Sequence, residues 1–170
     1  MTIQKATVHT LFNEALSELI HCYSEVPPDV WTVSSATGDG LLGARIKLNS
    51  GSAKCRVVLL ATEDSVRSLV GGTMIDCRDW LRELANQLAG RFKNKATALG
   101  LPISVTIPQS LIGSEVAGYG RPTEELIEAR WEGQSVFAVF HTDDRMFAEG
   151  QCEATAFTEA AAAEGSVCLF

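Results

Sequence analysis

Apolar residues recur every three or four positions in two long stretches of the chain. The first stretch predicts a helix over residues 10–24, and the second predicts a longer helix over residues 76–99 that ends before Gly100. A short helix is expected between them over residues 63–70, with Thr62 as its N-cap. The long helix has an apolar stripe that should pack on a sheet, formed by Trp80, Leu81, Leu84, Ala85, Leu88, Phe92, Ala96 and Leu99.

β-Strands are expected where short apolar stretches alternate with turns that contain glycine. The pattern predicts strands over residues 31–36, 42–48, 54–60, 103–107, 126–131 and 135–140. Turns join the first three strands, which predicts an antiparallel meander, and a turn at Gly133 joins the last two as a hairpin. A loop with several glycines is expected after Pro108. Helices interleaved with antiparallel hairpins predict an α+β fold with its helices packed on the sheet.

Length and charge narrow the class of protein. At 170 residues, the chain is long enough for one domain with a substantial core. The formal net charge of -7 argues against nucleic acid or an anionic membrane as a partner, because both attract basic patches. No apolar run reaches the length of a membrane span, and residues 1–5 do not begin a signal peptide. A cytoplasmic location is therefore expected.

The cysteine pattern gives no sign of a metal site or a disulfide framework. The five cysteines form no CxxC pair, and their number is odd. Cys55 alternates with apolar neighbours and is expected to be a reduced residue of the core. The serines lack a G-x-S-x-G context, and no other nucleophile is evident. The sequence therefore predicts no hydrolytic or redox machinery that is complete within this chain.

The face of the long helix opposite its apolar stripe carries Asp79, Glu83, Asn86, Gly90 and Asn94. Glu83 and Asn86 are three residues apart and should project from the same side. A carboxylate can pair with a lysine of a partner, and a carboxamide can both donate to and accept from a water. A glycine in a helix interior, such as Gly90, costs about 1 kcal/mol of stability relative to alanine, and a function that needs a partner's backbone to come close would offset that cost. The alternative is that these residues form only a solvated outer face, since an E-x-x-N spacing often arises by chance.

The wider context of this helix resembles a known family. Residues 79–94 contain the E-x-x-N spacing followed by Gly90 and Lys93, and they are similar to the signature helix of the CheC/CheX chemotaxis phosphatases. Residues 101–108 and 41–48 are similar to segments that flank this helix in the family. The resemblance spans roughly residues 10–143 and favours a CheX-like member of the CheC/CheX/FliY superfamily.

The resemblance implies a fold, an activity and a partner. It implies antiparallel sheet(s) with two long helices packed on one face. It also implies a phosphatase that hydrolyses the aspartyl phosphate of a phosphorylated CheY-like response regulator. In this interpretation Glu83 pairs with a lysine of the regulator, and Asn86 orients the attacking water. No cofactor is expected on this chain, because the Mg²⁺ of the reaction belongs to the regulator.

The resemblance also bears on the surroundings of the motif and on the extent of the domain. Asp79, Gly90, Lys93 and Asn94 are the expected partner-binding residues. The single E-x-x-N motif favours the CheX type, which implies a homodimer. The phosphatase domain is expected over residues 1–143, followed by a C-terminal extension of unknown role over residues 144–170. The alternative function is a non-catalytic dimeric module with the CheX fold that binds a response regulator or another signalling partner.

Overall fold

The computed structural model describes residues 5–36, 40–51, 53–71, 75–119 and 126–142. Its helices are α1 (Lys5–His21), α2 (Glu63–Val70), α3 (Cys77–Ala98) and α4 (Ser114–Gly118). Its strands are β1 (Asp29–Val33), β2 (Leu42–Ser50), β3 (Ala53–Ala61), β4 (Ser104–Val105), β5 (Gln109–Leu111), β6 (Leu126–Trp131) and β7 (Gln134–Thr142). The predicted C-terminal extension, residues 144–170, lies outside the described residues.

Two hairpins form the centre of a fully antiparallel sheet. The order of its strands is β1-β6-β7-β3-β2-β4, and β5 pairs with the remaining part of the β2 edge. The β6–β7 hairpin turns through Glu132 and Gly133, which both have positive φ angles, 45° and 79°. Two successive residues of this kind are typical of a tight hairpin turn whose twist matches that of the strands. This turn confirms the hairpin predicted at Gly133.

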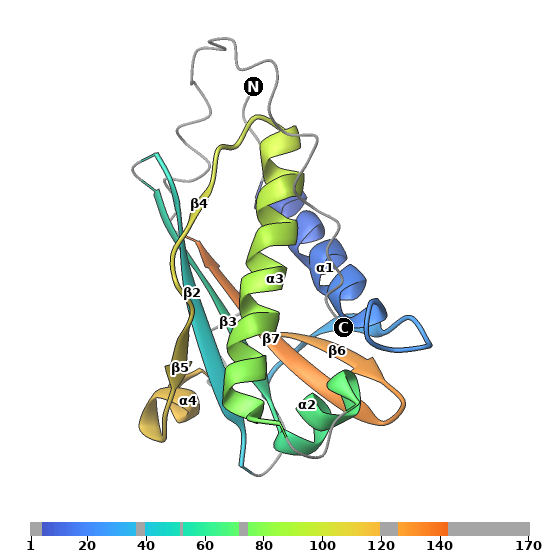
Figure 1. Cartoon of the computed structure of the whole chain (residues 1–170). Coiled ribbons are helices and arrows are strands. Elements are labelled where there is room, and N and C mark those ends of the chain that lie inside the picture. The colour runs from blue at the N-terminus through green and yellow to red at the C-terminus, as the bar shows by residue number, and fades with distance from the viewer. Residues whose placement is uncertain (1–4, 37–39, 52, 72–74, 120–125, 143–170) are drawn as a thin grey trace.

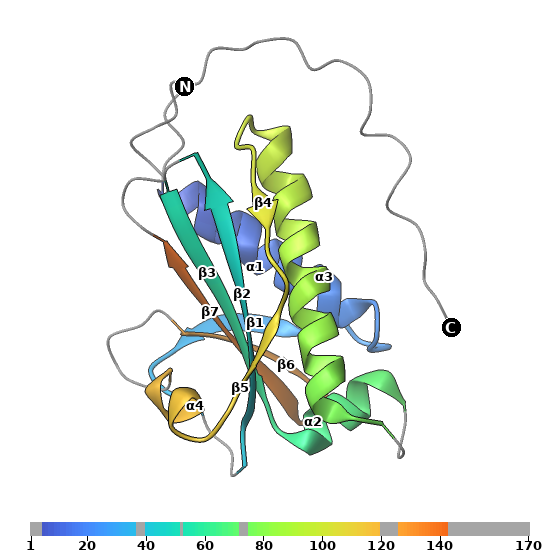
Figure 2. The ribbon, with the colours of Figure 1, turned by 60° about the vertical axis from the view of Figure 1, so that its left-hand side comes forward.

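The two long helices, α1 and α3, lie side by side on one face of the sheet (Figures 1 and 2). Their apolar stripes meet the sheet in one continuous core. At its centre, Phe12 of α1, Phe92 of α3 and Phe140 of β7 pack against one another, with ring centroids 4.8 to 5.8 Å apart. This arrangement confirms the predicted α+β fold, with two long helices packed on one face of an antiparallel sheet.

Helix α3 follows the sequence pattern closely. The side chain of Asp76 caps its N-terminus by accepting from the backbone N–H groups of Arg78 and Asp79, at 2.9 and 3.3 Å. Six of the predicted stripe residues are buried, whereas Trp80 is half-buried. Leu99 is 37% exposed and lies beyond the last helical residue, so its place in the buried stripe was wrong. The stripe fixes which face of α3 remains in solvent.

The predicted meander is wrong in its first strand. The β2–β3 hairpin forms as expected, but β1 pairs with β6, with Val33 opposite Leu126. Both edges of β2 are already occupied, one by β3 and the other by β4 and β5. No edge of β2 is therefore left for β1. The turn that suggested a link between them includes residues 37–39, which lie outside the described residues.

Two further boundaries differ from the sequence prediction. Helix α1 begins at Lys5 and ends at His21, rather than spanning residues 10–24, and its early turn buries Val8 completely. The strand expected over residues 103–107 is shortened to β4, and β5 forms after Pro108, where a loop was expected. Pro108 lies between β4 and β5 and has no N–H group to continue the ladder, and the preceding Ile107 is 85% exposed.

Candidate functional site

The outward face of α3 carries all six site residues predicted from the sequence. At about 100° per residue, they fall within an arc of roughly 100° that faces away from the sheet. Five of their side chains are exposed, and the glycine is half-buried; in order they are Asp79, Glu83, Asn86, Gly90, Lys93 and Asn94. The structure therefore brings the predicted site residues together on one surface, and it does so through a single helix.

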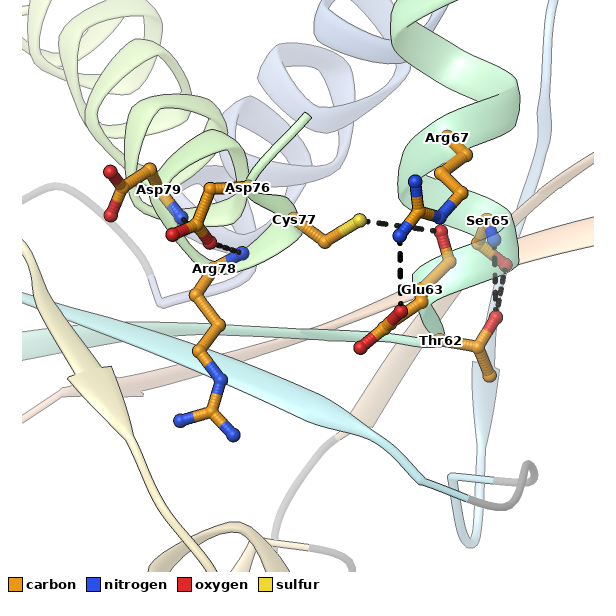
Figure 3. A network of polar contacts seen from close by, with 8 residues as sticks. All are labelled: Thr62, Glu63, Ser65, Arg67, Asp76, Cys77, Arg78 and Asp79. Carbon is orange, nitrogen blue, oxygen red and sulfur yellow. Dashed lines mark hydrogen bonds and ion pairs between the residues drawn. The ribbon is translucent and has the colours of Figure 1, made fainter. Parts of the chain in front are cut away.

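The start of this helix is fixed to the short helix before it. Figure 3 shows Asp76 and Asp79 at the N-terminal end of α3, with Cys77 pointing toward α2. The thiol sulfur of Cys77 lies 3.8 Å from the carbonyl oxygen of Glu63. Asp79 forms an ion pair with Arg82, one turn further along α3. Asp79 therefore already has a partner, while the first turn of α3 is held in place by its cap and by α2.

Glu83 and Asn86 differ in how their side chains are engaged. One carboxylate oxygen of Glu83 accepts a hydrogen bond from the amide nitrogen of Gln87, at 3.1 Å. The amide of Asn86 makes no hydrogen bond with any described residue. A carboxamide in this state keeps both its donors and its acceptor for a water or a partner. The pair thus combines a restrained carboxylate with an unengaged carboxamide.

This surface is the exposed side of a helix, which could enter a partner's cavity, and it does not enclose a pocket of its own. Two shallow cavities, with volumes of about 320 and 400 Å³, are lined by residues of other elements. The first lies beside Ser65 and Arg130, the second beside Arg45 and Ile107, and neither is lined by a residue of α3. A small substrate would therefore be poorly enclosed at Glu83 and Asn86. The arrangement suits contact with a larger partner that supplies its own cavity.

The bare backbone at Gly90 is not required by any described contact within this chain. A Cβ atom placed there would meet no heavy atom within 4 Å, and the residue lies in the interior of α3. Gly90→Ala is therefore expected to raise the free energy of unfolding by up to about 1 kcal/mol, because it removes the helix cost of glycine. Urea denaturation followed by circular dichroism measures the change. A loss of stability would contradict the open surface at this position.

Polar contacts join α1 and its C-terminal turn to α3 beside the site. Lys95 donates to Glu18 at 2.8 Å and to Glu14 at 3.3 Å. The pKa of Lys95 is raised, chiefly by its hydrogen bond to Glu18, against the opposing effect of partial burial, and the bond to Glu14 adds to the rise. The guanidinium of Arg91 lies 3.0 Å from the sulfur of Cys22. These contacts fix the end of α1 relative to the polar face of α3.

Sequence reasoning missed two residues that contact this face. Gln87 bonds to Glu83, and the hydroxyl of Tyr23 donates to the amide oxygen of Gln87 at 3.0 Å. The spacing of four residues between Glu83 and Gln87 is a signal that the sequence contained. Tyr23 lies 64 positions from Gln87, and no local pattern could have placed it there.

Within the described ranges, no three histidine, cysteine or acidic side chains gather as a metal site would need. None of the helices there is both long and apolar enough to cross a membrane.

Comparison with known proteins gives matches of fold. No family model and no curated protein sequence matches the chain. A CheC-like superfamily protein from Shewanella sp. PV-4 matches with a TM-score of 0.63 and 12% identity, over 82% of this chain and 99% of that one. A chain of the CheX–CheY complex with BeF3 and Mg²⁺ from Borrelia burgdorferi matches with a TM-score of 0.63 and 13% identity, over 81% and 98%.

A third solved structure, the chemotaxis protein CheX from Desulfovibrio desulfuricans, matches with a TM-score of 0.59 and 13% identity, over 81% of this chain and 99% of that one. The three matches cover nearly the whole length of each solved chain. At these identities they establish the arrangement of helices and strands. The protein therefore has the CheC/CheX-like fold that the sequence around Glu83 and Asn86 predicts.

Proposed function

We propose that this protein accelerates hydrolysis of the aspartyl phosphate on a CheY-like response regulator. One observation carries the proposal. On a fold shared with a CheX protein that forms a complex with CheY, α3 presents Glu83 and an unengaged Asn86 three residues apart on its exposed face. The same surface is not part of either cavity described above, which favours a partner that brings the reacting group.

The chemistry asked of this chain is positioning. Glu83 would form a charge-assisted hydrogen bond with a lysine of the regulator, which sets the distance between the two proteins. Asn86 would enter the regulator's site, accept from a water with its amide oxygen and align that water in line with the phosphorus. As the water oxygen bonds to phosphorus, the bond to the aspartyl oxygen breaks, and inorganic phosphate and a free carboxylate result. No covalent intermediate forms on this chain.

Mg²⁺ bound by the regulator would neutralise charge on the phosphoryl oxygens. The residues around the pair would contribute to docking. Lys93 and Asn94 are exposed on the same face as Asn86, and the absent side chain at Gly90 leaves room for the regulator's backbone. Asp79, at the beginning of the face, would have to exchange its pairing with Arg82 for a contact with the regulator. We also propose that the protein forms a homodimer and that it acts in the cytoplasm.

The direct test is the loss of labelled phosphoryl groups from purified CheY-like regulators of the same host. Wild-type protein is expected to shorten the lifetime of the phosphorylated regulator at least about tenfold, which corresponds to about 1.4 kcal/mol of barrier. A regulator incubated without the protein gives the spontaneous rate. Binding of the phosphorylated regulators without any faster loss of label would replace the phosphatase by the alternative, a non-catalytic module of the same fold.

A further inference from the structure

Tyr23, Gln87 and Glu83 form a linear chain of hydrogen bonds that ends at the proposed docking carboxylate. The hydroxyl of Tyr23 donates to the amide oxygen of Gln87 at 3.0 Å, and the amide nitrogen of Gln87 donates to Glu83 at 3.1 Å. Tyr23 and Gln87 are half-buried, whereas Glu83 is exposed. The chain of bonds therefore leads from the edge of the core outward to the surface.

We propose that Tyr23 and Gln87 are positioning residues that hold the Glu83 carboxylate ready for the regulator's lysine. This inference rests on the proposed function, and it assigns both residues to recognition of the regulator. A free glutamate on a helix surface samples several rotamers and loses that freedom when it pairs with a partner. Holding it in one orientation beforehand removes part of that loss and strengthens binding.

The direction of the hydrogen bonds supports this role. A carboxylate only accepts hydrogen bonds, so Gln87 must turn its NH₂ group toward Glu83. The hydroxyl of Tyr23 donates to the opposite end of the same amide and favours that orientation. Loss of the hydroxyl would remove the restraint at the oxygen end of the amide, so that Gln87, and Glu83 with it, could adopt other rotamers. Tyr23 therefore acts on Glu83 through Gln87.

The position of Tyr23 is itself fixed. Its backbone N–H donates to the carbonyl oxygen of Ile20 at 3.0 Å, just beyond α1, and its ring packs against the core. The contact between Arg91 and Cys22 joins the neighbouring residue to α3. Asn86 has no comparable support among the described residues. The structure thus supports the docking carboxylate through Gln87 and Tyr23 and gives Asn86 no such support among the described residues.

The test is the effect of Tyr23→Phe on the kinetics of regulator dephosphorylation. This change keeps the ring in its packing and removes only the hydroxyl. KM for the phosphorylated regulator is expected to rise about three- to tenfold, while kcat stays within about twofold, because the water-orienting group is unchanged. Tyr119→Phe is the matched control, since Tyr119 contacts Arg56 and packs against a smaller apolar cluster that contains no residue of α3. It should leave both constants unaltered.

A double-mutant cycle separates positioning from a general structural role. In a Glu83→Ala background, Tyr23→Phe should have no further effect on KM, because the group it positions is absent. If wild type hydrolyses and Tyr23→Phe leaves KM unchanged, or if its effect persists without Glu83, the inference is overturned while the proposed function stands.

The inference can also be tested if wild type binds the regulator without hydrolysis. The proposed function then fails, and the same cycle is measured on Kd for the phosphorylated regulator. Coupling of about three- to tenfold between Tyr23 and Glu83 would support positioning. Absence of that coupling, or of any binding, would overturn it.

Discussion

Asn86→Ala should reduce kcat for regulator dephosphorylation by at least about tenfold, and by up to a hundredfold if water alignment is the main contribution of this chain. The amide of Asn86 can both accept from the water and donate to the phosphoryl oxygens, and it lies one turn from the proposed docking carboxylate of Glu83. Because it makes no hydrogen bond with the described residues, its removal should leave the free energy of unfolding within about 0.5 kcal/mol. Single-turnover loss of label, measured with this protein in excess over the regulator, reports the rate within the complex.

The chain offers a matched control for this prediction in Asn94. It is the same residue type on the same exposed face, two turns further along α3. Asn94→Ala should change KM at most and leave kcat intact, because Asn94 lies too far along the helix to reach the same phosphoryl group. Equal losses of kcat at both positions, or none at Asn86, would refute the role of Asn86 in orienting water. The face would then be a docking surface without catalytic chemistry.

The parts of this molecule that local patterns determine could be predicted from the sequence. Helix α3 is the clearest case, because its cap at Asp76 and the alternation of Leu84 and Leu88 with Glu83 and Asn86 lie within one element. A helical period fixes which face is buried without knowledge of what covers it. The exposed placement of the proposed site follows from the same reasoning.

Pairings between distant segments could not be predicted in this way. The turn over residues 37–40 suggested β2 as the neighbour of β1, yet β1 pairs with β6, whose residues come more than ninety positions later. Which edge a strand joins depends on which edges other strands have taken, and no local turn encodes that. The contact between Tyr23 and Gln87 depends in turn on how α1 and α3 lie on the sheet. Such contacts are visible only once the whole core is assembled.

Three aromatic rings join α3, α1 and the sheet on the side of α3 that faces the core. Phe92 of α3 is fully buried, with its ring centroid 4.9 Å from that of Phe140 and 5.8 Å from that of Phe12. Phe12 and Phe140 stack at 4.8 Å. Phe92 projects from the side of α3 opposite Glu83 and Asn86. The rings therefore attach the helix to α1 and to the sheet without taking part in the exposed site.

Phe92→Ala should accordingly lower the free energy of unfolding by about 3–5 kcal/mol, through lost burial and the cavity left between the two helices and the sheet. Against a typical total of 5–15 kcal/mol, this is a large fraction. Urea denaturation monitored by circular dichroism measures it. Lys93→Ala is the control. Lys93 follows Phe92 directly in the chain but is exposed, so its replacement should change the free energy of unfolding by no more than about 0.5 kcal/mol.

The same variant separates stability from function. The outer face of α3 carries the proposed site, and its inner face only packs against the core. The fraction of Phe92→Ala protein that remains folded should therefore retain most of its kcat for the regulator. Its KM should rise, because looser packing of α3 against α1 and the sheet weakens the hydrogen bond between Tyr23 and Gln87 that holds Glu83. A destabilisation below about 1 kcal/mol would mean that α3 is not anchored through this cluster. If kcat fell while KM stayed unchanged, core packing would instead control the position of Asn86.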